Sequence, residues 1–204
     1  MKSFNFPFLR DFPKQRIAIG RLLLAYAELE VELCNCIAAA YDLNIAVKAL
    51  YRMRGESQRI QIADGLAREL YTTAKLETPF SETIGDLGYA VQIRNQYSHC
   101  CWARDGKYLA FVNYEDAAKT NSRADRAVTI FYRVDLALLK KQETFFAYVQ
   151  DCLFYLQSEY QNRTGDPPNS VWPKPAKVQR PPLHKQKLEP KNRIGAKGKS
   201  RARQ

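Results

Sequence analysis

The pattern of apolar and polar positions predicts a mainly α-helical chain. Apolar residues recur at three- and four-residue steps along most of its length, which is the spacing of amphipathic helices that share a core. Proline suits the first turn of a helix and glycine the position after its last turn, so Pro13 and Pro79 favour helix starts and Gly55 a helix end. The predicted helices span residues 13–42, 45–54, 56–76, 79–99 and 135–163.

The first predicted helix is expected to be the central core helix, ending near Asp42. One stripe along it follows alternating three- and four-residue steps and should face the core. We expect this buried stripe to consist of Ile17, Gly20, Leu24, Ala27, Val31, Cys34 and Ala38, widened by Leu23, Tyr26, Leu33 and Ile37.

Before the last helix the apolar period changes from helical to alternating. Residues 108–112 and 128–134 each alternate in the manner of a half-buried strand, and a polar stretch over residues 114–125 separates them. Asp105-Gly106, just before the first run, is a turn signal. The predicted fold is therefore a mainly α, up-and-down bundle of about five helices with a small antiparallel β-hairpin insertion before the last helix.

Composition divides the chain in two. Residues 1–163 are expected to form one helical domain, whereas residues 164–204 contain seven of the ten prolines and 11 Lys and Arg against two acidic residues. This segment carries a net charge of +9 out of +11 and is predicted to be a disordered arm. Such an arm either contacts a polyanion such as RNA or only aids solubility. The cations concerned are Lys185, Lys187, Lys191, Arg193, Lys197, Lys199, Arg201 and Arg203.

Several classes of protein are disfavoured by what the sequence does not contain. No apolar run has the length of a membrane span, and the first residues do not resemble a signal peptide. Five cysteines are an odd number, and their spacing is not that of a zinc site, so we expect no metal and no cofactor. Reduced thiols in a cytoplasmic protein are the expected state.

The candidate chemistry lies in the segment Arg94-Asn95-Gln96-Tyr97-Ser98-His99, near the end of the fourth predicted helix. His99 is the only histidine before the tail, so it is the obvious carrier of acid–base chemistry near neutral pH. Asn95 precedes it by four residues, and on a regular helix its amide would hydrogen-bond and orient the imidazole. Arg94 precedes it by five, roughly 140° away around the helix, so those two side chains would meet only at a frayed helix end or across a dimer.

The Arg94-Asn95-x-x-x-His99 pattern, late in a long helix of an up-and-down bundle, resembles the HEPN superfamily. Many members of that superfamily are metal-independent endoribonucleases, toxins or phage-defence effectors, active as dimers whose paired motifs line one cleft. The resemblance covers residues 16–163 in architecture and these six residues in motif. It implies RNA as substrate, a homodimer, and an antitoxin or another regulatory protein as a further partner.

Carried to this chain, the resemblance assigns three roles. His99 would act as base or acid in attack of a ribose 2′-hydroxyl on the neighbouring phosphate. Arg94 would stabilise the phosphorane-like transition state, Asn95 would orient His99, and the product would be a 2′,3′-cyclic phosphate. One HEPN subgroup carries a modifiable Tyr two residues after the histidine. Cys101 occupies that position here, which puts regulation of that kind in doubt.

Simpler interpretations of the same residues remain open. His99 can be a helix cap, and Arg94 can pair with a carboxylate such as Asp86 or Asp64. Tyr97 and Trp102 are expected in the core or a dimer interface, and Cys100 and Cys101 are expected to be unreactive. The alternative function is a non-catalytic HEPN-like module that binds a nucleotide, RNA or a protein. A third is a structural adaptor that packs its last helix, over residues 145–160, on another protein.

Overall fold

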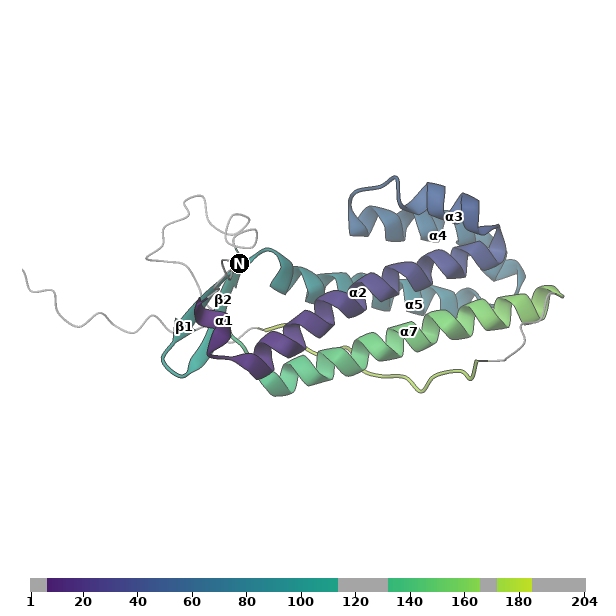
Figure 1. The fold of residues 1–204 in the computed structure, drawn as a ribbon. Coiled ribbons are helices and arrows are strands. Elements are labelled where there is room, and N and C mark those ends of the chain that lie inside the picture. The colour runs from purple at the N-terminus through teal and green to yellow at the C-terminus, as the bar shows by residue number, and fades with distance from the viewer. Residues whose placement is uncertain (1–6, 114–131, 166–171, 185–204) are drawn as a thin grey trace, which may run out of the picture.

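A computed structural model describes residues 7–113, 132–165 and 172–184. From Pro13 onward each helix, the short one over residues 43–50 included, runs in the direction opposite to the one before it, and the small sheet lies at one end of the bundle (Figure 1). The predicted fold class, an up-and-down bundle of about five helices with a small antiparallel sheet before the last helix, is confirmed. The helices are α1 (Pro7–Arg10), α2 (Pro13–Ala40), α3 (Leu43–Leu50), α4 (Glu56–Thr73), α5 (Glu77–Ser98) and α7 (Leu136–Thr164).

Helix ends lie close to the predicted positions because local signals fix them. Pro13 occupies the first turn of α2. The Asp42 carboxylate accepts a hydrogen bond from the backbone N–H of Ile45 at 2.9 Å and so begins α3. Asp135 begins α7 in the same way. Gly165 ends α7 in a left-handed conformation, with φ of 91°, that costs glycine little.

The core lies where α2, α5 and α7 pack together, with α4 against α5 and α2. Its largest fully buried side chains include Tyr71, Phe80 and Phe145, and the Tyr71 and Phe80 rings stack at 4.5 Å between centroids. None of the described helices is both long and apolar enough to cross a membrane.

The buried face of α2 differs from the predicted stripe. Ile17, Leu24 and Val31 are 51%, 72% and 44% exposed, and Ala27 is exposed as well. Apolar residues at helical spacing occur on two opposite sides of α2, and periodicity alone does not say which side meets the other helices. Packing buries the opposite side, made of Ala18, Ile19, Leu22, Tyr26, Leu29, Leu33, Cys36 and Ile37. Tyr26, Leu33 and Ile37 of the predicted set are therefore buried as expected, and so is Cys34.

The sheet has three antiparallel strands in the order β1 (Cys100–Asp105), β2 (Tyr108–Asn113) and β3 (Tyr132–Arg133). Pairing between β2 and β3 confirms the predicted hairpin insertion in its described part; the other predicted strand positions, and the polar loop over residues 114–125, lie outside the described residues. Strand β1 was not predicted. It follows α5 directly and returns as β2 through a turn in which Gly106 takes a positive φ of 57°.

The predicted disordered arm is wrong for residues 172–184. This segment runs in an extended conformation back along the bundle (Figure 1). The Trp172 ring lies 4.9 Å from that of Phe154, and the Tyr89 hydroxyl donates to the backbone carbonyl of Pro181 at 2.7 Å. Prolines prevent a regular helix in this segment. An extended segment can still pack on the bundle, because its backbone carbonyls and side chains can contact the folded helices. The folded unit therefore extends beyond residue 163, whereas the eight tail cations lie outside the described residues.

Candidate functional site

The Arg94–His99 segment closes α5, and its ends differ in environment. Arg94 lies within the helix with its side chain half-buried, whereas His99 is the exposed residue that caps the C-terminus, with φ of −118° and ψ of 36°. Within the described residues the imidazole of His99 makes no hydrogen bond or ion pair. The expectation of a histidine at the end of this helix is confirmed.

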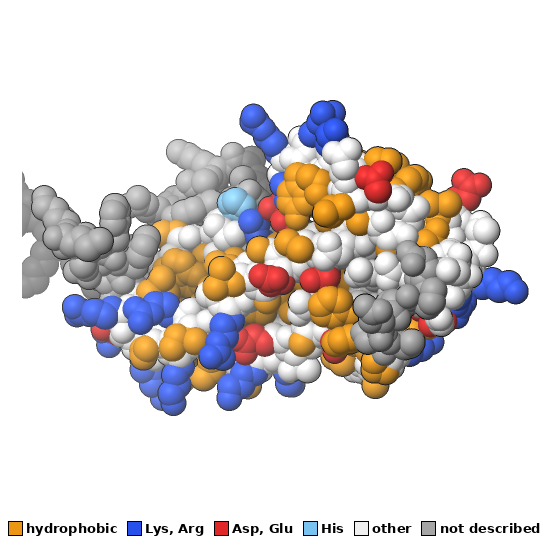
Figure 2. Space-filling model, turned by 45° about the vertical axis from the view of Figure 1, so that its right-hand side comes forward, with side chains coloured by type: hydrophobic (Ala, Val, Ile, Leu, Met, Phe, Trp, Pro, Cys, Tyr) orange, Lys and Arg blue, Asp and Glu red, His pale blue; other side chains and the backbone are white. Residues whose placement is uncertain are grey.

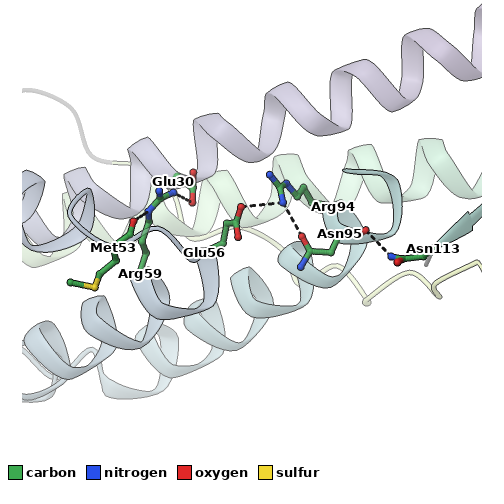
Figure 3. A network of polar contacts seen from close by, with 7 residues as sticks. All are labelled: Glu30, Met53, Glu56, Arg59, Arg94, Asn95 and Asn113. Carbon is green, nitrogen blue, oxygen red and sulfur yellow. Dashed lines mark hydrogen bonds and ion pairs between the residues drawn. The ribbon is translucent and has the colours of Figure 1, made fainter. Parts of the chain in front are cut away.

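Arg94 is held by contacts with residues of three helices, and Figure 3 draws those with Glu56 and Asn95. Its Nη1 lies 3.0 Å from Oε1 of Glu56, the first residue of α4, and donates at 3.0 Å to Oδ1 of Asn95. Its guanidinium also lies 5.7 Å from the centroid of the Tyr26 ring of α2. Glu56 is thus the paired carboxylate. The two partners expected as alternatives are occupied elsewhere, since Asp64 pairs with Arg68 and Asp86 with Arg180.

A second ion pair lies beside the first and extends the network. Arg59 of α4 pairs with Glu30 of α2 at 2.6 Å and donates to the backbone carbonyl of Met53 (Figure 3). Burial, reinforced by the Glu30 and Glu56 carboxylates, raises the pKa of the Tyr26 phenol well above its ordinary value. Two ion pairs, Arg59–Glu30 and Arg94–Glu56, therefore lie near the neutral Tyr26 phenol and join α2, α4 and α5.

Asn95 does not orient His99 as predicted. Its side-chain oxygen accepts from Arg94, and its backbone carbonyl accepts from Nδ2 of Asn113 on β2 at 3.1 Å. In the described part of the chain no hydrogen bond joins Asn95 to His99. The prediction assumed helical geometry through residue 99, but the backbone leaves that geometry at His99, so positions 95 and 99 no longer face each other.

The two central residues of the segment hold the C-terminal extended stretch. Tyr97 is buried, as expected of a core aromatic, and its hydroxyl lies 2.9 Å from Nδ1 of His184. The side-chain oxygen of Gln96 accepts from the backbone N–H of His184 at 3.2 Å. His184, interpreted from sequence as a tail residue without a partner, is only 3% exposed. Its proline-rich neighbourhood gave no sign of this burial.

The hydrogen bonds around His184 fix its tautomer. The backbone N–H of Asp135 donates to Nε2 at 2.9 Å, so Nε2 carries no proton. The Tyr97 hydroxyl donates to Oε1 of Gln142 at 2.6 Å, so the Tyr97 oxygen accepts the proton carried by Nδ1 of His184. Burial lowers the pKa of His184 to about 4, which keeps the ring neutral. His184 therefore has a structural role: it joins the C-terminal segment to α5 and to the start of α7.

The adjacent cysteines differ in environment. Cys100 is half-buried and its thiol donates to the backbone carbonyl of Tyr97 at 3.2 Å. Burial raises the pKa of the Cys100 thiol to about 12, which disfavours the reactive thiolate and fits the expected inert role. Cys101 points to the exposed side of β1. Trp102 is half-buried with its ring 5.7 Å from that of Phe111, which agrees with the expected packing role.

Two hollows on the described surface lie away from the candidate residues. One, of about 360 Å³, is lined by Gln15, Tyr108, Arg133, Val134, Asp135 and Leu136. The other, of about 210 Å³, lies where the C-terminal segment crosses α5 and α7 and includes Thr83, Cys152 and Lys174. Neither of these two hollows is lined by Arg94, Asn95 or His99; Arg94 and Asn95 are partly buried, and His99 is exposed.

The structure therefore joins the side chains of Arg94 and Asn95 by a hydrogen bond, whereas His99 is hydrogen-bonded to neither of them. Comparison of the chain with protein-family models, with characterised proteins and with solved structures gave no match.

Proposed function

We propose that the protein is a metal-independent endoribonuclease of the HEPN type, with His99 as the group that moves the proton. The observation that carries this proposal is the exposed imidazole at the end of α5, five residues after a partly buried guanidinium. Imidazole is suited to accept and donate a proton near neutral pH, and guanidinium to bind a phosphate that gains charge. Attack of a ribose 2′-hydroxyl on the adjacent phosphate is accelerated by proton transfer and by stabilisation of charge on the phosphate, which these two groups would supply.

The contacts of Arg94 leave it able to bind a phosphate. Both its ion pair with Glu56 and its hydrogen bond to Asn95 use Nη1. Within the described residues no contact engages Nε or Nη2, and these nitrogens carry three of the five N–H donors of the side chain. In this proposal Glu56 and the Tyr26 ring hold the guanidinium in place, and its Nε and Nη2 donors bind a phosphate of the RNA.

A second copy of the chain completes the reaction in this proposal. Cleavage by the 2′-hydroxyl needs a base for the nucleophile and an acid for the leaving oxygen. His99 supplies one such group in each chain, and His184 cannot supply the other because both its ring nitrogens are bonded and its ring is buried. Two His99 side chains across a twofold axis would serve as base and acid. An RNA-degrading toxin or phage-defence effector is the biological role that follows.

The test is cleavage of end-labelled RNA in the presence of EDTA. We expect fragments with 2′,3′-cyclic phosphate ends, and we expect His99→Ala to lower the rate by roughly 10²–10⁴-fold, the usual contribution of general acid–base catalysis. Gln92→Ala, an exposed position on the same helix, is the matched control and should keep the wild-type rate. Cleavage by His99→Ala at the wild-type rate would refute the proposal.

A second candidate is a non-catalytic module that binds a nucleotide, RNA or a protein at the same surface. Two contacts favour it: Glu56 neutralises Arg94, and Asn95 faces Arg94 rather than His99. This function predicts RNA binding, measured by fluorescence anisotropy, that Arg94→Ala weakens while no cyclic-phosphate ends form. Growth arrest on expression that His99→Ala relieves would favour cleavage instead.

A further inference from the structure

The larger of the two hollows, of about 360 Å³, lies where the starts of α2 and α7 meet the sheet. Its volume is at the lower end of the range for sites that hold small organic molecules. Val134 and Leu136 give it an apolar side, whereas Gln15 and Arg133 bring side-chain hydrogen-bond donors to it. The lining therefore suits a compact ligand that is part apolar and part polar.

Exposed lysines from two elements stand beside this hollow. Lys140 follows the lining residue Leu136 by four positions, so the two share one side of α7. Lys107 is also exposed, and its Nζ lies 5.4 Å from the centre of the ring of Tyr108, which lines the hollow. Both ammonium groups therefore belong to the rim of the hollow.

The start of α2 adds two more cations. Lys14 and Arg16 are the neighbours of the lining residue Gln15 in the first turn of the helix, and both are exposed. Neither of them, nor either rim lysine, forms an ion pair with any residue in the described part of the chain. Figure 2 shows Lys and Arg side chains gathered at the end of the bundle where α2 and α7 begin.

Carboxylates near the hollow do not balance these charges. Asp135 is the one carboxylate among the lining residues, and it accepts from the backbone N–H of Ala137 at 2.8 Å. Asp105 cancels the charge of Arg133, whose Nε and Nη2 both donate to its Oδ2. Four exposed cations against Asp135 then leave a net charge of +3. Nη1 of Arg133 has no hydrogen-bond partner within the described residues.

We propose that this hollow binds a terminal phosphate group and the compact organic group that carries it. A phosphate monoester has a charge of about −1.5 to −2 at neutral pH and three strong acceptor oxygens. Nη1 of Arg133 and the Gln15 amide donate to these oxygens, and the rim cations offset the charge. Val134 and Leu136 pack on the organic part. The phosphate belongs either to a free sugar phosphate or to the first nucleotide of an RNA.

The hollow is separate from the His99 end of α5. Tyr108 pairs with Asp105 at one end of β1, and His99 precedes Cys100 at the other end. The five steps from Cys100 to Asp105 span roughly 17 Å along the strand at about 3.4 Å per residue. A compact ligand in the hollow therefore does not contact His99, and its binding is independent of the proposed ribonuclease activity.

The first test compares ligands that differ only in the phosphate, by isothermal titration calorimetry on the full chain. Ribose 5-phosphate is compared with ribose, and a 5′-phosphorylated RNA tetramer with its 5′-hydroxyl form, both 2′-O-methylated to prevent cleavage. We expect the phosphate to tighten binding roughly tenfold or more. A gain with ribose 5-phosphate would identify a free organic phosphate as sufficient, and a gain with the tetramer alone would identify an RNA 5′ end. No gain in either comparison would overturn the proposal.

Charge reversals then locate the binding. The double variant Lys107→Glu, Lys140→Glu should lose the preference for phosphate, because two attractive charges become repulsive. Lys48→Glu, Arg52→Glu reverses two exposed cations in and just after α3, is the matched control, and should keep the preference. His99→Ala should keep it as well, whether or not the chain cleaves RNA. A preference that survives in the rim variant, or that the control loses to the same extent, would overturn the proposal.

Discussion

The buried His184 makes the strongest quantitative prediction, because its protonation is linked to folding. Its pKa falls from the ordinary 6.5 to about 4 in the folded chain. Between these values the unfolded chain binds a proton that the folded chain does not, so the free energy of unfolding rises with pH. The stabilisation from neutral His184 is therefore complete above pH 6.5 and is lost as the pH falls toward 4.

The magnitude follows from the interval between the two pKa values. At about 1.4 kcal/mol for each pH unit the interval corresponds to about 3 kcal/mol, and about 2 kcal/mol of this should disappear between pH 7 and pH 4.5. His184→Gln removes the titrating ring. We expect the variant to be less stable than wild type at pH 7 by roughly 1–3 kcal/mol, the cost of unpaired buried polar groups. The gap should shrink by about 2 kcal/mol at pH 4.5.

Urea unfolding of wild type and variant at the two pH values measures this directly. The difference between the two proteins isolates His184, because the carboxylates titrate in both. His99→Gln is a matched control that removes one histidine without touching the buried network. A gap between wild type and His184→Gln that stays the same at both pH values would show that His184 is not held neutral by burial.

Three further predictions concern the core, the Arg94 contact and the cysteines. Phe145→Ala should lower the free energy of unfolding by roughly 3–5 kcal/mol, because the ring is fully buried; a loss below about 1 kcal/mol in urea would contradict the packing. Glu56→Gln removes the counter-charge of Arg94, so RNA should bind several-fold more tightly by anisotropy, whereas weaker binding would mean that Glu56 positions Arg94 for RNA. Brief alkylation at pH 8, read by peptide mass spectrometry, should modify exposed Cys101 well before Cys100; equal rates would argue against burial of Cys100.

The candidate site shows which features can be predicted from local sequence and which depend on tertiary packing. Helical periodicity and Pro79 were enough to place Arg94 late in α5 and His99 at its end. The partner of Arg94 was not predictable, because Glu56 begins a different helix and meets it only when α4 packs against α5. Asn95 was assigned to His99 on the assumption of a regular helix, and the change of backbone at the helix end removed that contact.

The sequence by itself determined the helical fold class, the approximate helix ends and the location of its one exposed histidine. These depend on periodicity, caps and residue type, which act over a few positions. Tertiary structure decided which of the two apolar faces of α2 is buried and that residues 172–184 dock beside the Arg94–His99 segment. Both outcomes depend on surfaces contributed by distant parts of the chain, and the free energy of burying one face rather than another appears only when those surfaces meet.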